Sequence, residues 1–168
     1  MKRDRLKAKG RREGGTFIAF PHACFNHANY IELGAYAIKL LFDLYGNYNG
    51  NNNGDFCCTW SMMKKRKWKS ESTLSKARKE LLYYGWIICS RHGGRNRASL
   101  YAVTFQPIDN CKGKLDIKET VTAPANWKEP KTPLKNKSLV REVEQLTMPP
   151  DVMVWKTPSF TTELLQHA

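Results

Sequence analysis

The feature that most constrains the fold is an amphipathic helix followed closely by two strand-like runs, all within residues 70–105. Ser70 is a candidate N-cap for this helix, and Gly85 predicts its end, in the position after the C-cap. Between them the apolar residues recur at helical spacing and form one stripe: Leu74, Ala77, Leu81 and Tyr84. We therefore expect a helix of about fourteen residues here.

Two strand-like runs follow, residues 86–90 and 98–105. In the second run Leu100, Ala102 and Thr104 alternate with Tyr101, Val103 and Phe105, which is the two-residue period of a strand. The sequence RHGGRNR separates them, and its two glycines, Gly93 and Gly94, predict a hairpin turn. Three arginines are then expected at the tip of this hairpin: Arg91, Arg95 and Arg97.

Two further helices are predicted upstream. Apolar residues recur at helical spacing over 34–48, and this stretch ends in the sequence YNGNNNGD, which cannot continue a helix. Residues 56–58 are a candidate brief strand. Thr59 is a candidate N-cap for a short helix whose buried residues would be Trp60 and Met63.

This order of elements, with a basic turn between the last two helices, is the layout of a winged helix-turn-helix domain. Residues 17–105 resemble the winged-helix modules of phage, plasmid and integrative-element proteins that regulate transcription or initiate replication. The resembling residues are FIAFPHA near the start, the loop YNGNNNGD, the pair Thr59 and Trp60, and the string ST-L-x-x-A-x-x-E-L-x-x-x-G-W-I over 72–87.

The sequence departs from the winged-helix pattern in the turn between the last two helices. Such proteins usually carry an apolar residue and a small residue in this turn, whereas Lys67, Trp68 and Lys69 stand here. Two explanations stay open: Trp68 supplies the missing apolar contact from a shifted position, or the turn is longer than usual.

The expected fold is α+β, a winged helix-turn-helix domain of three helices and a C-terminal β-hairpin wing over residues 16–106. Residues 1–15 form a basic arm, expected to be flexible, and residues 107–168 form an irregular tail. Six of the eight prolines follow Thr120, so we expect no packed core in the tail, whose one helical candidate is 138–146. Two roles are left for the tail, contact with a protein partner or with a second protomer of a homodimer.

The net charge of the 168-residue chain is +13, and it is concentrated in two segments. Residues 1–13 carry a balance of +5 and residues 56–105 a balance of +9, whereas residues 14–55 carry −2 and residues 106–168 carry +1. This concentration favours an anion-binding surface over a merely solvated one, and it makes a polyanion the first partner to consider.

The basic segments suit double-stranded DNA. Short polar and cationic side chains near the N-terminus of a helix read base edges in the major groove, and here they are Ser70, Ser72, Thr73, Lys76 and Lys79. The turn before that helix would neutralise phosphates through Lys64, Lys65, Arg66, Lys67 and Lys69. The wing would reach a minor groove through Arg91, Arg95, Asn96 and Arg97. The arm would do the same through Arg3, Arg5, Arg11 and Arg12.

The predicted function is therefore non-enzymatic, sequence-specific binding of double-stranded DNA, in a transcription regulator of the repressor type on a mobile genetic element. The alternative is a replication initiator of a phage or plasmid. An RNA or single-strand binder is disfavoured, because Ser72 and Thr73 stand where exposed aromatic residues would be needed.

The sequence predicts no cofactor. Its apolar runs and its cysteines indicate the cell compartment. The longest apolar run is far below the roughly 18 residues of a membrane span, which excludes a membrane partner. Five cysteines without a CxxC pair indicate neither a disulfide framework nor a zinc ribbon. These features fit a cytoplasmic, nucleoid-associated bacterial protein.

A zinc site is a competing hypothesis. His22, Cys24 and His27, together with Cys57 and Cys58, have side chains that bind zinc. Their spacing matches none of the usual structural-zinc patterns, so we expect no metal.

Two further alternatives concern a nuclease and single-strand stacking. A nuclease needs clustered carboxylates or paired histidines, and the basic block offers only Glu71 and Glu80. Trp60, Trp68 and Trp86 are candidates for stacking platforms, but their positions on apolar faces favour core packing.

Overall fold

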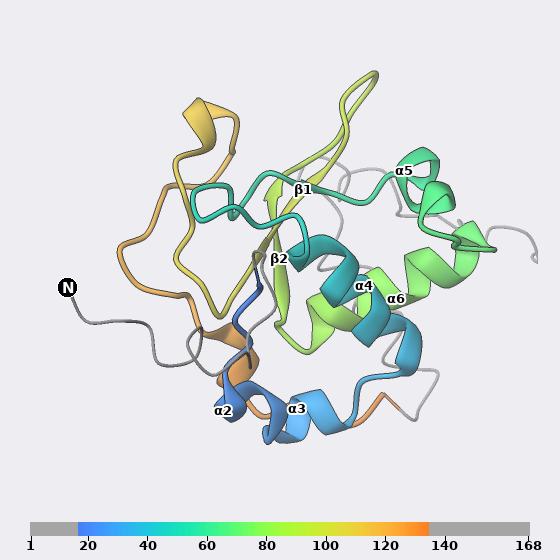
Figure 1. The fold of residues 1–168 in the computed structure, drawn as a ribbon, viewed down its shortest axis with the longest axis vertical. Helices are drawn as coiled ribbons and strands as arrows, with labels where there is room; N and C mark the ends of the chain where they lie inside the picture. The colour runs from blue at the N-terminus through green and yellow to red at the C-terminus, as the bar shows by residue number, and fades with distance from the viewer. Residues whose placement is uncertain (1–16, 135–168) are drawn as a thin grey trace, which may run out of the picture.

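The structure is a computed structural model that describes residues 17–134. Within these residues the protein is α+β, with five α-helices and a three-stranded antiparallel sheet (Figure 1). The helices are α2 (His22–Phe25), α3 (Ala28–Ile31), α4 (Ala35–Tyr45), α5 (Trp60–Lys65) and α6 (Glu71–Tyr83). The strands are β1 (Phe56–Cys57), β2 (Ile87–Arg91) and β3 (Leu100–Val103). The basic arm 1–15 and the helical candidate 138–146 lie outside the described residues.

Helix α6 begins and ends where its local sequence predicts. Ser70 is the N-cap, and its Oγ accepts a hydrogen bond from the Thr73 N–H at 3.4 Å. Gly85 follows the C-cap with φ +72, a left-handed conformation that glycine adopts more easily than residues with a Cβ atom. The Trp86 N–H then donates to the Leu81 carbonyl at 2.9 Å, as in a Schellman motif. Both predicted ends of this helix are confirmed.

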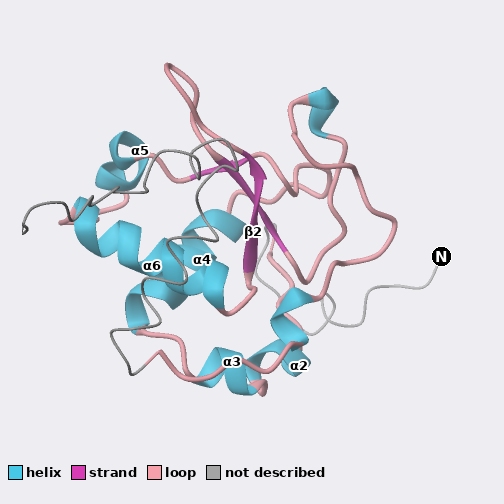
Figure 2. Cartoon of the chain, turned by 180° about the vertical axis from the view of Figure 1, so that it is seen from behind, coloured by secondary structure: helices cyan, strands magenta, loops and turns pink. Residues whose placement is uncertain are grey.

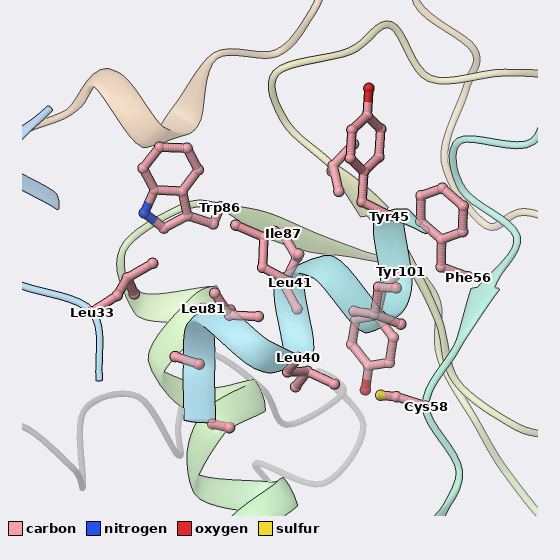
Figure 3. Close-up of a cluster of buried hydrophobic side chains, with 14 of the residues drawn as sticks. Leu33, Leu40, Leu41, Tyr45, Phe56, Cys58, Leu81, Trp86, Ile87 and Tyr101 are labelled. Atoms are coloured by element: carbon pink, nitrogen blue, oxygen red, sulfur yellow. The ribbon is translucent and has the colours of Figure 1, made fainter. Parts of the chain in front are cut away.

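The core lies between α4, α6 and the sheet (Figure 3). Figure 3 shows Leu40 and Leu41 of α4 close to Leu81 of α6 and to Ile87 and Tyr101 of the sheet. These five side chains are at most 5% exposed. Full burial contributes about 1.5–3 kcal/mol for a large aliphatic side chain. The apolar stripes predicted for the two helices therefore meet in one core.

Strand β3 is the centre of the sheet, with β1 on one side and β2 on the other, both antiparallel to it. The pairing of β2 with β3 shifts between Cys89 and Arg91, so that Ser90 lies outside the ladder. Ser90 is buried, and its hydroxyl donates to the Gly54 carbonyl at 2.5 Å. The bulge falls at the end of β2, where the hairpin leaves the sheet.

The hairpin turn lies further along the chain than predicted. Gly94 and Arg97 exchange two backbone hydrogen bonds, of 2.9 and 3.0 Å, so Arg95 and Asn96 are the turn residues. Asn96 has φ +62, a conformation that asparagine adopts more readily than most residues. The predicted hairpin between the two strands is confirmed. Its tip lies after the two glycines, because Asn96 supplies the left-handed residue of the turn.

Other local predictions also need correction. The upstream helix spans 35–45 rather than 34–48, and the helices number five within the described residues rather than three. Thr59 occupies the N-cap position of α5, but its Oγ1 lies 3.3 Å from Ser61 Oγ and caps no backbone N–H. Trp60 is only half-buried, whereas Met63 is buried as expected.

The segment 107–134, predicted to lack a packed core, contributes to the core. Ile108 and Trp127 are buried, and the Trp127 ring stacks on Trp86 with centroids 5.4 Å apart and planes at 14°. The prediction failed because it treated proline content as a guide to packing. Prolines prevent regular secondary structure, but an irregular segment can still bury a large side chain.

Asn29 of α3 joins the beginning and the end of the described chain. Its Nδ2 donates to the carbonyls of Trp127 at 2.8 Å and Glu129 at 2.6 Å, and its Oδ1 accepts from the Lys131 N–H at 3.2 Å. Its own carbonyl accepts from Trp86 Nε1 at 3.2 Å. With 1% exposure, this asparagine has its amide satisfied by the segment that follows the sheet.

Candidate nucleic-acid interface

The cationic segments lie toward one end of the molecule. In both views the hairpin and α5 lie in the upper half, whereas α2 and α3 lie at the bottom (Figures 1 and 2). Residues 66–70 connect α5 directly to the N-terminal end of α6. The basic turn and the hairpin arginines are therefore on the side of the molecule away from α2 and α3.

The five predicted phosphate contacts are all exposed, but they do not all lie in the turn between α5 and α6. Lys64 and Lys65 belong to the last turn of α5, and Arg66, Lys67 and Lys69 follow it. Lys67 has φ +64, in the position after the C-cap where helices usually place glycine. The Trp68 N–H donates to the Met63 carbonyl at 3.2 Å, which closes the end of α5 as Trp86 closes the end of α6. A lysine thus occupies a backbone position that favours glycine.

Trp68 supplies the apolar contact of the turn. The side chain is 4% exposed and belongs to the core, and the Lys39 ammonium lies 5.0 Å from the centre of its ring. Its Nε1 donates to Asp43 Oδ2 at 2.8 Å. Trp68 therefore makes the apolar contact that the first explanation requires, and the connection of five residues, 66–70, agrees with the second.

Asp43 of α4 ties this turn to the rest of the fold. Besides Trp68, its carboxylate accepts from Lys39 Nζ at 2.5 Å and from Arg66 Nε at 2.8 Å. Burial raises the pKa of Asp43, but the hydrogen bonds from Lys39, Trp68 and Arg66 outweigh burial and lower it. Arg66 thus has a structural partner as well as its predicted phosphate contact.

The predicted base-reading residues of α6 differ in accessibility. Ser72 and Lys76 are exposed and lie one helical turn apart on the same face. Thr73 is half-buried, and Ser70 acts as the cap with its Oγ 2.7 Å from Ser72 Oγ. Lys79 is half-buried further along the helix. Ser72 and Lys76 are therefore the most accessible members of this set.

Tyr36 at the start of α4 is a residue that the sequence analysis missed. It is 61% exposed and lines a hollow of about 140 Å³ together with Lys69, Ser70 and Thr73. Its aromatic ring lies 5.9 Å from that of Trp68. The available signal was its position, since Tyr36 is an aromatic residue outside the apolar stripe of its helix.

The hairpin presents only part of the predicted wing set at its tip. Arg95, Asn96 and Arg97 are exposed. Arg91 lies at the base of the hairpin, half-buried, with Nη2 donating to the Ala98 carbonyl at 3.1 Å. The expectation that Arg91 is at the tip is therefore wrong, because the turn lies further from Arg91 than the glycines suggested.

Asp116 anchors the base of the hairpin, and no sequence pattern pointed to it. Its Oδ2 accepts from the His92 N–H at 2.8 Å, and its Oδ1 lies 3.4 Å from Arg97 Nη2. Its own N–H donates to the Ser90 carbonyl at 2.9 Å. One residue of the segment 107–134 thus contacts both arms of the hairpin.

The residues of the zinc hypothesis have other roles. Cys24 and Cys58 are buried, and burial raises the pKa of each thiol to about 11. His27 Nδ1 accepts from the Asn29 N–H at 3.2 Å and so caps α3. Among residues 17–134, no group of three or more His, Cys, Asp or Glu side chains lies close enough to hold a metal ion.

The predicted preference of tryptophans for the core is confirmed for Trp68 and Trp86, which are 4% and 0% exposed. No helix in the described part of the chain is long and apolar enough to cross a membrane. Comparison of the chain with protein families, with curated proteins and with solved structures finds no match.

Proposed function

We propose that the protein binds double-stranded DNA sequence-specifically through a winged helix-turn-helix domain, and that it regulates transcription as a repressor on a mobile genetic element. The observation that carries this proposal is the exposed cationic turn before α6, which Asp43 and Trp68 hold in place. Helix α6 is the recognition helix, and the hairpin between β2 and β3 is the wing.

The size and surface of α6 support a role in the major groove. An α-helix is about 10–12 Å across with its side chains, close to the groove width of about 12 Å. Ser72 and Lys76 are exposed on its N-terminal half, where a docked helix meets base edges. A serine hydroxyl can both donate and accept hydrogen bonds, and lysine donates to guanine.

The cations around α6 support contact with two backbones. Four lysines at the end of α5 and in the turn to α6 are exposed: Lys64, Lys65, Lys67 and Lys69. They precede the N-terminal end of α6, where the helix dipole also favours an anion. Arg95 at the hairpin tip suits the negative potential of a narrow minor groove.

Two of the three candidate stacking tryptophans, Trp68 and Trp86, favour a duplex over a single strand, whereas Trp60 is half-buried. Proteins that bind single strands stack bases on exposed aromatic rings. Trp68 and Trp86 are buried in the core, so neither can act as a stacking platform.

The first test is the salt dependence of binding. A duplex selected from a random library is titrated with the full chain by fluorescence anisotropy at several salt concentrations. If the protein neutralises about six phosphates, log K is expected to fall with log salt with a slope of about −5. A slope near zero would contradict DNA binding altogether.

The second test separates base contacts from phosphate contacts. Lys76→Ala is expected to cost about 1–3 kcal/mol on the selected duplex and little on random duplex. Lys65→Ala is expected to weaken binding to both duplexes alike, and to reduce the salt slope by about 1. Lys118→Ala, an exposed lysine outside the proposed interface, is the matched control. Equal losses on both duplexes for Lys76→Ala would contradict its assigned role.

The regulatory role has its own test, the recovery of bound DNA across the genome. A repressor is expected at promoters, including its own. Clustered repeats at a replication origin would contradict the regulatory role and leave DNA binding intact.

A further inference from the structure

A groove of about 480 Å³ lies between the C-terminal half of α6 and the strands β2 and β3. Its floor is apolar and aromatic, formed by Leu82, Ile88, Cys89 and Tyr101. Arg78 and Lys79 of α6 also line it. A groove with apolar side chains and two cations fits an amphipathic segment that carries a carboxylate.

The described chain ends beside this groove. Tyr83, which lines the groove, donates from its Oη to the Thr132 carbonyl at 3.0 Å. The Leu134 N–H donates to the Tyr84 Oη at 3.2 Å. Residues after Leu134 therefore start from the C-terminal end of α6, next to the groove.

Residues 138–146, outside the described part of the chain, have the sequence that such a groove requires. Leu139, Val143 and Leu146 are spaced i, i+4 and i+7, which forms one apolar stripe on a helix. Glu142 falls at the edge of that stripe, three residues after Leu139.

The connection is long enough. The stretch from Leu134 to Leu139 spans up to about 17 Å when extended, at roughly 3.4 Å per residue. The groove follows α6 from Tyr83 back to Arg78, which is about 8 Å along the helix axis at 1.5 Å per residue. The segment can therefore enter the groove of its own chain.

We propose that residues 138–146 dock as a helix into this groove of the same chain. The stripe Leu139, Val143 and Leu146 covers the apolar floor, and Glu142 faces the cations Arg78 and Lys79. The proposal does not require DNA binding. Since Lys79 also belongs to the predicted DNA-contacting set, the docked segment and DNA would compete for this side of α6.

The test uses Cys89, whose thiol lies in the groove, in the full-length chain. Each protein is treated with N-ethylmaleimide, and the rate of labelling at Cys89 is followed by peptide mass mapping. Cys111 is half-buried outside the groove and serves as the internal reference. The variant Leu139→Glu, Val143→Glu, Leu146→Glu removes the stripe, whereas Gln145→Glu adds a charge away from the stripe and is the matched control.

If the segment is docked for 80–90% of the time, the triple variant is expected to label at Cys89 about five to ten times faster than the natural chain. The Gln145→Glu control is expected to label at the natural rate, and Cys111 is expected to be unaffected in all proteins. Equal rates at Cys89 in the natural chain and the triple variant would overturn the proposal. Protection that increases with protein concentration would assign the groove to a second copy, and would equally overturn docking within one chain.

Discussion

At the scale of single residues, Asp43 determines where the basic turn lies. Its carboxylate accepts three hydrogen bonds, from Lys39 of its own helix and from Arg66 and Trp68 of the turn. Removing one member of a buried ion pair leaves its partners unpaired in a poorly solvated site. Here the side chains of Lys39 and Arg66 are 40% and 49% exposed, so solvent reduces that penalty.

Asp43→Asn is expected to lower the free energy of unfolding at neutral pH by about 1–3 kcal/mol, because an amide offers one acceptor oxygen to three donors. Urea denaturation measures this difference. Glu119→Gln, at an exposed position, is the control and is expected to change stability little. An Asp43→Asn variant as stable as the natural chain would contradict the role of this carboxylate.

The lowered pKa of Asp43 makes its contribution to stability fall as the pH falls. Because folding lowers the pKa of this carboxyl, its contribution is complete above the unfolded pKa of about 3.9 and is lost as the pH falls through the lower folded value. The difference in stability between the natural chain and Asp43→Asn is therefore expected to shrink as the pH falls below about 4. A constant difference down to about pH 2 would contradict the lowered pKa.

At the scale of elements, the turn between α5 and α6 combines a strained backbone with an exposed charge. Lys67 is left-handed at φ +64, a conformation that costs a residue with a Cβ about 1–2 kcal/mol. Glycine would adopt it freely but would carry no cation. If the protein binds DNA as proposed, the strain at Lys67 accompanies a cation that contacts phosphate.

Lys67→Gly is expected to raise the free energy of unfolding by about 1 kcal/mol and to weaken DNA binding, because strain and charge are removed together. Lys65→Gly is the matched control. It removes a cation from the helical part of α5, so it is expected to lower both stability, by about 1 kcal/mol, and DNA affinity. Thermal unfolding and anisotropy measure the two quantities. A Lys67→Gly protein less stable than the natural chain would contradict the strain.

The hairpin offers a comparison between its tip and its base. Arg95→Ala is expected to weaken duplex binding and to leave the melting temperature nearly unchanged, because an exposed charge contributes little to stability. Arg91→Ala is expected to lower the melting temperature instead, since Arg91 is half-buried and bonded to the Ala98 carbonyl. An unchanged dissociation constant for Arg95→Ala would leave the hairpin without a role in binding.

The elements that the sequence predicted well are those with local determinants. Helix α6 carries its own cap in Ser70 and its own stop in Gly85, so its limits could be derived without knowledge of the tertiary fold. The hairpin turn was misplaced because both Gly and Asn tolerate a left-handed backbone, and the choice between Gly94 and Asn96 depends on the register of the strands.

The sequence could not show the contacts that join distant segments. Neither Asp116 beneath the hairpin nor Trp127 on Trp86 belongs to a periodic pattern. Asp43 did leave a signal, as a single acid within the apolar run LLFDLY, although its three donors could not be named from it. In the candidate interface the charges were therefore predictable, whereas the residues that position them were not.

At the scale of the whole molecule, the segment 107–134 belongs to the same core as the helices. Trp127 is 7% exposed and stacks on Trp86, which is fully buried. Gly85 approaches the same segment closely, since a Cβ atom there would lie 2.6 Å from the Asn126 carbonyl oxygen. The end of α6 is therefore shaped to accept this segment.

Trp127→Ala is expected to lower the free energy of unfolding by about 3–5 kcal/mol, because it opens a large cavity beside Trp86. Val121→Ala, at a position of the same segment that is 98% exposed, is the control and is expected to change stability by less than about 0.5 kcal/mol. Chemical denaturation of both variants measures the difference. If the Trp127→Ala protein were as stable as the natural chain, residues 107–134 would not contribute to the stability of the domain through Trp127.

The contacts of Asn29 also have a consequence in time. Its partners Trp127 and Lys131 come 98 and 102 residues later in the chain. Contacts this distant in sequence form slowly, and during synthesis they must wait until the second partner has been made. The basic turn and the hairpin are synthesised well before that point. Each newly made molecule therefore passes through an interval in which its charged surface is complete. During that interval the contacts of Asn29 with Trp127 and Lys131 have not yet formed.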